Sequence, residues 1–443
     1  MCALSIVGVR HLLTCFFSFY LLFPHSLQLT RATNETPLEV FAEVGLPPKK
    51  AFVYEADMLD IQVFVEAYCA QLESSVGTLS EGHAAALEEV LQHTPAFSFP
   101  SLRSPAQSQT QEGDIDIFCT LLWSLDACPL QHESYARAAS SLIEVAATAL
   151  LAESRGISVS QLLLGDLSVS PSKHCSFYTA ALNDDVQEMV SSAAFGAKHT
   201  PHLKVKLDGN ASRCAIILDT LATWSSSSSS SRSSSTHTDS GDARDWWSID
   251  ANCAWSPALA LSMSSELLPK YRERIKMIEQ PFPVSLVFQA AQQEQRKGKG
   301  SEGEDLQQWV HAKESLNRLG IDVYADESMR TYLDIAALAP YVNGVNIKME
   351  KVGGYRAALK AVACAQEAGL KVWFGCMVGS NLNSTQTAAL APLADGGSDL
   401  DGSLLVTEDS KLFTGGFQFG SNGTIVLEPL AGLGVQLKAH VSI

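Results

Sequence analysis

Eight short apolar runs, each followed by a helix-length segment, constrain the fold of this sequence more than any other feature. Alternation of this kind is typical of a parallel β-sheet built from repeated strand–helix units. Eight is the number of strands that a closed α/β barrel needs. The sequence therefore predicts a barrel. The runs are 176–180, 203–207, 247–250, 277–279, 323–326, 344–348, 372–375 and a weaker one near Asp399.

Most of these runs close on a charged side chain. A lone acid after a strand is usually a loop residue or a helix cap. An ordered set is different, because all strands of such a barrel end at the same face and charged groups are seldom buried unless they are paired or bind a metal. We therefore expect a functional site at this face. The set comprises Lys204 and Lys206, then Asp250, Glu279, Asp326, Lys348 and, one strand later, Asp399 and Asp401.

The order of these charges predicts a particular chemistry. Three carboxylates from adjacent strands, Asp250, Glu279 and Asp326, suit a hard divalent cation such as Mg²⁺. A lysine beside a dication and a second ammonium has a lowered pKa and can act as a base. Lys206 and Lys348 flank the acids on opposite sides. One of them could remove the proton next to a metal-bound carboxylate, and the other could return a proton on the opposite face of the enediolate.

These stretches resemble the enolase superfamily, in its muconate-lactonizing and mandelate racemase branch. Within it they are most similar to dipeptide epimerases related to L-Ala-D/L-Glu epimerase, over about residues 140–435. The resemblance implies a modified TIM barrel, (β/α)7β, with an α+β capping domain. The matching stretches are Lys204-Val205-Lys206, Asp250-Ala251-Asn252, Glu279-Gln280-Pro281, Ala325-Asp326-Glu327-Ser328, Asn346-Ile347-Lys348, Lys351-Val352-Gly353-Gly354, Gly375-Cys376-Met377 and Asp399-Leu400-Asp401-Gly402.

The resemblance also assigns the central roles. It implies one Mg²⁺ per chain, bound by Asp250, Glu279 and Asp326. Lys206 and Lys348 would be the acid and base of a 1,1-proton transfer at the α-carbon of a dipeptide. The implied activity is that of an isomerase acting on amino acid derivatives, a racemase or epimerase.

Further residues would bind the substrate. Lys204 would stabilise the bound carboxylate and the enediolate, and Thr179 and the backbone near Cys376 would line the site. Asp399 and Asp401 would hold the α-ammonium of a dipeptide. A cycloisomerase or an o-succinylbenzoate synthase-like reaction is the alternative that uses the same lysines and acids. The acidic pair argues against it, because two carboxylates repel a substrate that has no cation.

The sequence departs from the family at its N-terminus. Residues 1–36 are expected to be poorly ordered or signal-like, and the capping domain, predicted at 37–165, would then lack its first strands. A catalytically impaired homologue without a lid is therefore a further alternative. A tail at about 416–443 would pack back on the capping domain. The barrel is expected at 175–415, with disordered inserts at 225–240 and 292–305, which are serine-rich and charged, respectively.

Composition bounds the partners and the compartment. The formal net charge of −17 disfavours nucleic acid, so the expected partner is a small molecule, and a homo-oligomer is compatible with the sequence. The apolar segment 12–24 is too short to span a bilayer but has the length of a signal-peptide core. A cytoplasmic location is favoured, and secretory or organellar targeting is the alternative. Residues 1–36 could also be an artefact of the gene model. The ten cysteines form no C-x-x-C pair, so a zinc knuckle is not indicated.

Overall fold

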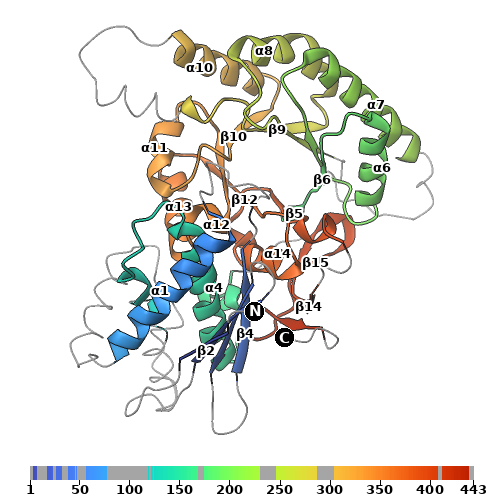
Figure 1. Cartoon of the computed structure of the whole chain (residues 1–443). Coiled ribbons are helices and arrows are strands. Elements are labelled where there is room, and N and C mark those ends of the chain that lie inside the picture. The colour runs from blue at the N-terminus through green and yellow to red at the C-terminus, as the bar shows by residue number, and fades with distance from the viewer. Residues whose placement is uncertain are drawn as a thin grey trace.

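The chain is represented by a computed structural model, shown in Figure 1. The residues that it describes are 3–6, 17–22, 26–31, 38–44, 46, 56–76, 118, 121–122, 124–167, 174–229, 246–286, 304–407 and 412–438.

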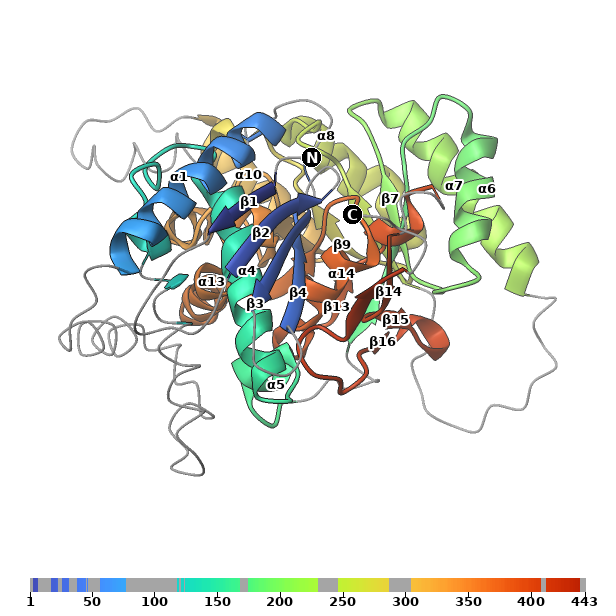
Figure 2. The same ribbon diagram turned by 60° about the horizontal axis from the view of Figure 1, so that its bottom comes forward.

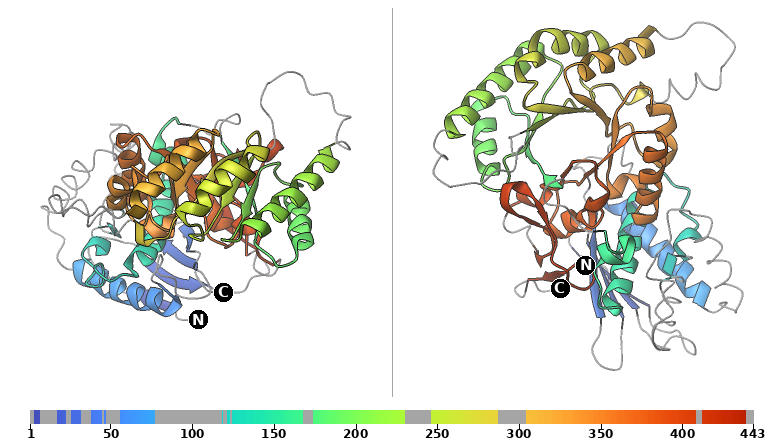
Figure 3. Two further views of the ribbon diagram at one scale, coloured as in Figure 1. Left: turned by 90° about the horizontal axis from the view of Figure 1, so that it is seen from above. Right: turned by 180° about the vertical axis from the view of Figure 1, so that it is seen from behind.

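Eight parallel strand positions form a barrel, as the sequence predicts. The order in the sheet is β5-β13-β12-β11-β10-β9-β8-β7-β6. Only Phe177 separates β5 from β6, so the two ends of the sheet are consecutive pieces of one strand and the sheet closes into a ring (Figure 3). The strands are β5 (Cys175–Ser176), β6 (Tyr178–Ala180), β7 (Leu203–Lys206), β8 (Trp247–Asp250), β9 (Ile275–Glu279), β10 (Asp322–Ala325), β11 (Gly344–Ile347), β12 (Lys371–Gly375) and β13 (Gly397–Asp399).

Helices follow the first seven strands and surround the ring, which gives the (β/α)7β architecture (Figure 1). Local sequence starts several of them: Ser256 caps α8, with Pro257 in its first turn. Most of the predicted inserts 225–240 and 292–305 lies outside the described residues, whereas 225–229 and 304–305 are helical ends. The helices are α6 (Val186–Gly196), α7 (Ala211–Ser229), α8 (Pro257–Ser262), α10 (Glu304–Asn317), α11 (Ile335–Leu338), α13 (Tyr355–Glu367) and α14 (Asn381–Ala388), with the short α12 (Met349–Val352) before α13.

A capping domain packs beside the barrel (Figure 2). Its antiparallel sheet has the order β1-β2-β3-β4 and is packed against α4. Three of these strands come from the part of the chain for which disorder and missing strands are expected. The described residues there form strands instead: residues 17–22 of the apolar run 12–24 form β2, which pairs with β1 and β3. The elements are β1 (Ala3–Ile6), β2 (Phe17–Leu22), β3 (Ser26–Arg31), β4 (Leu38–Glu43), α1 (Met58–Val76), α4 (Ala136–Ser154) and α5 (Val159–Leu164).

The C-terminal segment runs back over the capping domain. The ring of Phe413 lies 5.3 Å from that of Phe41 in β4, and the Val159 N–H at the start of α5 donates to the Gly432 carbonyl oxygen. This segment contains the strands β14 (Phe413–Gly415), β15 (Gln418–Phe419), β16 (Ile425–Val426) and β17 (Val435–Leu437). No helix among the described residues is long and apolar enough to cross a membrane.

Large side chains fill the barrel below the level of the charged residues. Phe177, Met277, Tyr324 and Trp373 form one buried cluster. Phe177, Met277 and Tyr324 lie two residues before Thr179, Glu279 and Asp326, respectively, so alternation along the strand aims both members of each pair into the barrel. A Cβ at Gly344 would lie 2.2 Å from the Tyr324 ring, so glycine makes room for this layer. This layer therefore fills the barrel on the amino-terminal side of the charged residues.

Candidate active site

The two predicted acid/base lysines lie on opposite sides of the barrel. Lys206 ends β7 and Lys348 follows β11, and four strand steps separate β7 from β11 in either direction around the ring. Asp250, Glu279 and Asp326 end or follow the three strands between them. Strand register places Lys206 beside Asp250 and Asp250 beside Glu279. A substrate held over these carboxylates would have one lysine on each side.

Lys204 is the cation at the centre of the acids. Its Nζ lies 2.7 Å from Glu279 Oε2, 2.7 Å from Asp399 Oδ2 and 3.4 Å from Asp250 Oδ2. Burial lowers the pKa of Lys204, but the attraction of Asp399, Glu279 and Asp250 outweighs burial and raises the pKa well above its usual value. These contacts favour the charged form of Lys204.

Lys206 and Lys348 each contact one carboxylate. Lys206 Nζ lies 3.1 Å from Asp250 Oδ2 and donates to Asn252 Oδ1 at 3.0 Å, and its side chain is 31% exposed. Lys348 Nζ donates to Asp326 Oδ2 at 2.8 Å and is 8% exposed. Each amine therefore lies beside a carboxylate of the predicted metal site, and Lys206 is the more solvent-exposed of the two.

Lys351, to which sequence reasoning assigned no role, contacts the third carboxylate of the predicted metal site. Its side chain is fully buried, and Nζ donates to Asp326 Oδ1 at 2.5 Å, to the Asp326 carbonyl oxygen at 2.6 Å and to the Asn346 carbonyl oxygen at 3.0 Å. Burial raises the pKa of Asp326, but Lys348 and Lys351 outweigh it, and the pKa falls well below its usual value. Asp326 is thus held ionised and in one orientation.

Gln280 and Asn252, two further residues without a predicted role, connect the strand ends. Gln280 Oε1 accepts the N–H groups of Asp326 and Ser328, and its Nε2 donates to the Phe282 carbonyl oxygen at 2.9 Å. Asn252 bridges Lys206 and Glu327, since its Nδ2 donates to Glu327 Oε1 at 3.2 Å. Gln280 and Asn252 have φ values of 41° and 43°, so the backbone is strained where it leaves two acid-bearing strands. In the sequence, both residues stand within the stretches that resemble the family, one or two positions after an acid.

The predicted substrate-binding residues form a second cluster beside the first. Asp401 Oδ2 accepts the Thr179 N–H at 2.5 Å, and the Thr179 hydroxyl lies 3.4 Å from Asp399 Oδ1. Cys376 donates its backbone N–H to the Asp399 carbonyl oxygen at 2.9 Å. Burial and the neighbouring Asp399 raise the pKa of Asp401 well above its usual value. A cation bound beside Asp399 and Asp401 would relieve the repulsion between these two buried carboxylates.

The three central carboxylates suit a divalent cation in donor type. Burial, and after it Asp250 and Asp326, raise the pKa of Glu279 to about 8 despite the nearby Lys204. Glu279 Oε2 contacts Lys204 as an ion pair but makes no directed hydrogen bond. Among the described residues no three His, Cys, Asp or Glu side chains are already gathered around one point, because lysine ammoniums lie against these carboxylates. Carboxylate oxygens are the donors that Mg²⁺ prefers, and a bound ion would shift these ammonium contacts.

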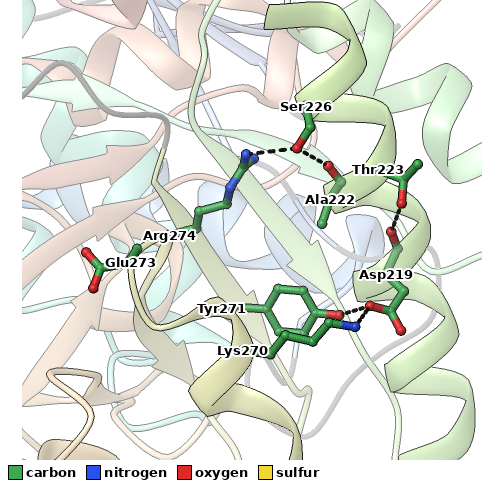
Figure 4. Close-up of a pocket in the computed structure, with 8 residues that line it drawn as sticks. All are labelled: Asp219, Ala222, Thr223, Ser226, Lys270, Tyr271, Glu273 and Arg274. Atoms are coloured by element: carbon green, nitrogen blue, oxygen red, sulfur yellow. Dashed lines mark hydrogen bonds and ion pairs between the residues drawn. The ribbon is translucent and has the colours of Figure 1, made fainter.

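A separate pocket of about 520 Å³ lies outside the barrel, between α7 and the segment before β9 (Figure 4). Asp219 there accepts hydrogen bonds from Lys270 and Tyr271, and Arg274 donates to Ser226. The Arg274 carbonyl oxygen accepts the backbone N–H of Trp247, which begins β8, whereas Asp250 ends that strand. The pocket is therefore at the other end of the strands from the acids.

Comparison with known proteins agrees with this geometry. The family described as "Enolase C-terminal domain-like" matches residues 300–441. An enolase superfamily member of Dictyostelium discoideum is 31% identical over 429 residues, which cover 94% of this chain and 92% of that protein. An L-Ala-D/L-Glu epimerase of Bacteroides thetaiotaomicron is 34% identical, but the match covers 42% of this chain and 41% of that enzyme.

Solved structures share the fold over nearly the whole chain. A dipeptide epimerase of Enterococcus faecalis, complexed with Mg and the dipeptide L-Leu-L-Tyr, superposes with a TM-score of 0.61 at 19% identity. The match covers 93% of this chain and 91% of that one. A muconate lactonizing enzyme has a TM-score of 0.59 at 18% identity, with 96% and 95% covered. These matches include the capping domain as well as the barrel.

Proposed function

The chain belongs to the enolase superfamily, and we propose that it is a Mg²⁺-dependent dipeptide epimerase. The observation that carries the proposal is the placement of Lys206 and Lys348 four strands apart on either side of three buried carboxylates. The names of the similar bacterial enzymes, L-Ala-D/L-amino acid epimerase and L-Ala-D/L-Glu epimerase, support the same reaction.

Asp250, Glu279 and Asp326 would hold the metal. A magnesium ion, when bound, supplies positive charge beside the substrate carboxylate and so makes the α-proton more acidic. Lys351 and Gln280 would fix Asp326 for this task, because both bind its main chain or carboxylate.

The two lysines would move the proton. A neutral amine at one lysine takes the α-proton, so the C–H bond breaks and its electron pair passes into the substrate carboxylate as an enediolate. The ammonium of the other lysine then gives a proton to the opposite face, and the α-carbon is inverted. Lys204, in its charged form, would offset the second negative charge that the enediolate carries.

The acidic pair supports a dipeptide rather than another carboxylate. Asp399 ends β13 and contacts Lys204, and Asp401, two residues later, accepts the Thr179 N–H. The α-ammonium of a dipeptide would neutralise this pair. A cycloisomerase or o-succinylbenzoate synthase-like substrate has no such cation, and replacing both acids with asparagine would then affect binding little.

The test is incubation of the protein with a dipeptide library in deuterated water with Mg²⁺. We expect deuterium at one α-carbon together with the inverted epimer. Lys206→Ala and Lys348→Ala should each give no inverted epimer, and each should keep α-proton exchange only from the epimer whose proton the remaining lysine removes. Lys371→Ala is the matched control, because Lys371 pairs with Asp322 at the opposite end of the strands. Normal epimerisation without Lys348 would contradict the two-base mechanism. No exchange with any dipeptide would favour an impaired homologue or another reaction.

A further inference from the structure

Backbone hydrogen bonds hold α12 between Lys348 and α13, but no side chain of this segment caps the start of α13. The short helix α12 begins directly after Lys348 and ends at Gly353, whose φ is 106°. The N-cap of α13 is Gly354, with a φ of 115° and no side chain to accept an N–H of the first turn. Something outside this segment must therefore satisfy the start of α13.

Helix α4 of the capping domain supplies that partner, and it packs against both α12 and α13 (Figure 1). Glu144, 2% exposed, accepts the Arg356 N–H at 2.6 Å and the Arg356 Nε–H at 2.9 Å. Arg137, two turns earlier on α4, donates to the Lys351 carbonyl oxygen at 2.8 Å. A Cβ at Gly354 would lie 2.9 Å from Glu144 Cδ, so glycine permits this approach. The capping domain thus contacts the C-terminal end of α12 and the first turn of α13.

We propose that Glu144 is a positioning residue, through which the capping domain holds the Lys348 side of the site in place for proton transfer. The link runs from Glu144 to the α13 N-terminus, and from there to α12, which carries Lys351 on Asp326. Lys206 is held differently, by Asp250 and Asn252 of the barrel itself. This inference rests on the proposed two-base function, and it predicts that loss of Glu144 affects one face of the substrate more than the other.

Glu144→Gln tests the proposal with little change of size. With a dipeptide in deuterated water, α-proton exchange is followed from each epimer separately by NMR. Lys348→Ala first identifies the epimer whose proton this lysine removes. We expect Glu144→Gln to slow exchange from that same epimer by about ten- to a hundredfold, at little change in KM, while exchange from the other epimer falls far less.

Glu153→Gln is the control, because Glu153 lies on the same helix but near Gly432. If the exchange rate fell equally for both epimers, as it would if less of the protein were correctly folded, the positioning role would be overturned. Amide hydrogen exchange of residues 346–356 is measured in parallel on the full chain. Protection should fall there in Glu144→Gln and persist in Glu153→Gln, and unchanged protection would overturn the proposal. If the wild-type chain exchanges no dipeptide, the proposed function fails, and amide exchange alone still decides whether Glu144 holds this segment.

Discussion

Replacing Lys351 with methionine is a direct test of how the site holds its third carboxylate. Methionine keeps an unbranched apolar stem in a fully buried position, so the change removes mainly the ammonium. Asp326 loses one of its two cations, and two buried carbonyl oxygens lose a donor. Breaking a buried ion pair costs about 3–5 kcal/mol. Lys348 still pairs with Asp326, so we expect the unfolding free energy to fall by about 3 kcal/mol, the lower end of that range.

The assay is urea unfolding followed by tryptophan fluorescence, without added metal. Lys313→Met is the matched control: Lys313 also donates to two carbonyl oxygens, those of Pro340 and Val342, but it is only partly buried. That control should lose no more than about 1 kcal/mol. Added Mg²⁺ should restore more stability to Lys351→Met than to Lys313→Met, because a bound dication replaces the missing charge at Asp326. Equal losses in the two variants would refute the reasoning.

Three further predictions concern the barrel interior. Gly344→Ala should destabilise the fold by about 1–3 kcal/mol through overlap with the Tyr324 ring, and Tyr324→Leu should relieve most of this in a double-mutant cycle; additive losses would exclude the clash. Burial lowers the pKa of His202 to about 4, so stability present above about pH 6.5 should fall by about 3 kcal/mol as the pH drops to about 4. His202→Phe should remove that slope in pH-dependent urea unfolding, and an unchanged slope would assign it to other groups. Gln280→Glu places an oxygen against the Phe282 carbonyl oxygen and should cost about 2 kcal/mol in thermal or urea unfolding, whereas a neutral result would show that this amide is not essential.

Much of the barrel and its site could be predicted because the signals are local. A short apolar run marks a strand wherever it occurs, and a charge that closes the run marks the end at which parallel strands meet. The positions of all eight runs are confirmed by the structure. The gathering of Asp250, Glu279 and Asp326 between two lysines follows from strand order alone, although their metal-binding role stays a prediction.

The capping strands could not be predicted in the same way. The apolar segment 12–24 has the length of a signal-peptide core and also suits a strand, and residues 17–22 form β2. Periodicity cannot separate these readings over so few residues. Pairing with β1 and β3 is a non-local property that only the folded chain supplies.

The sequence by itself determined which residues carry charge and in what order around the barrel they appear, because strand order follows chain order in repeated strand–helix units. Only the tertiary structure decided how those charges are held. Lys204 reaches Asp399 across 195 residues, and Glu144 caps α13 across 212 residues. Contacts at such separations depend on how layers pack and leave no periodic trace in the chain. This is why the role of Glu144 emerged only from the fold, whereas the two lysines predicted to act as acid and base were found in the sequence.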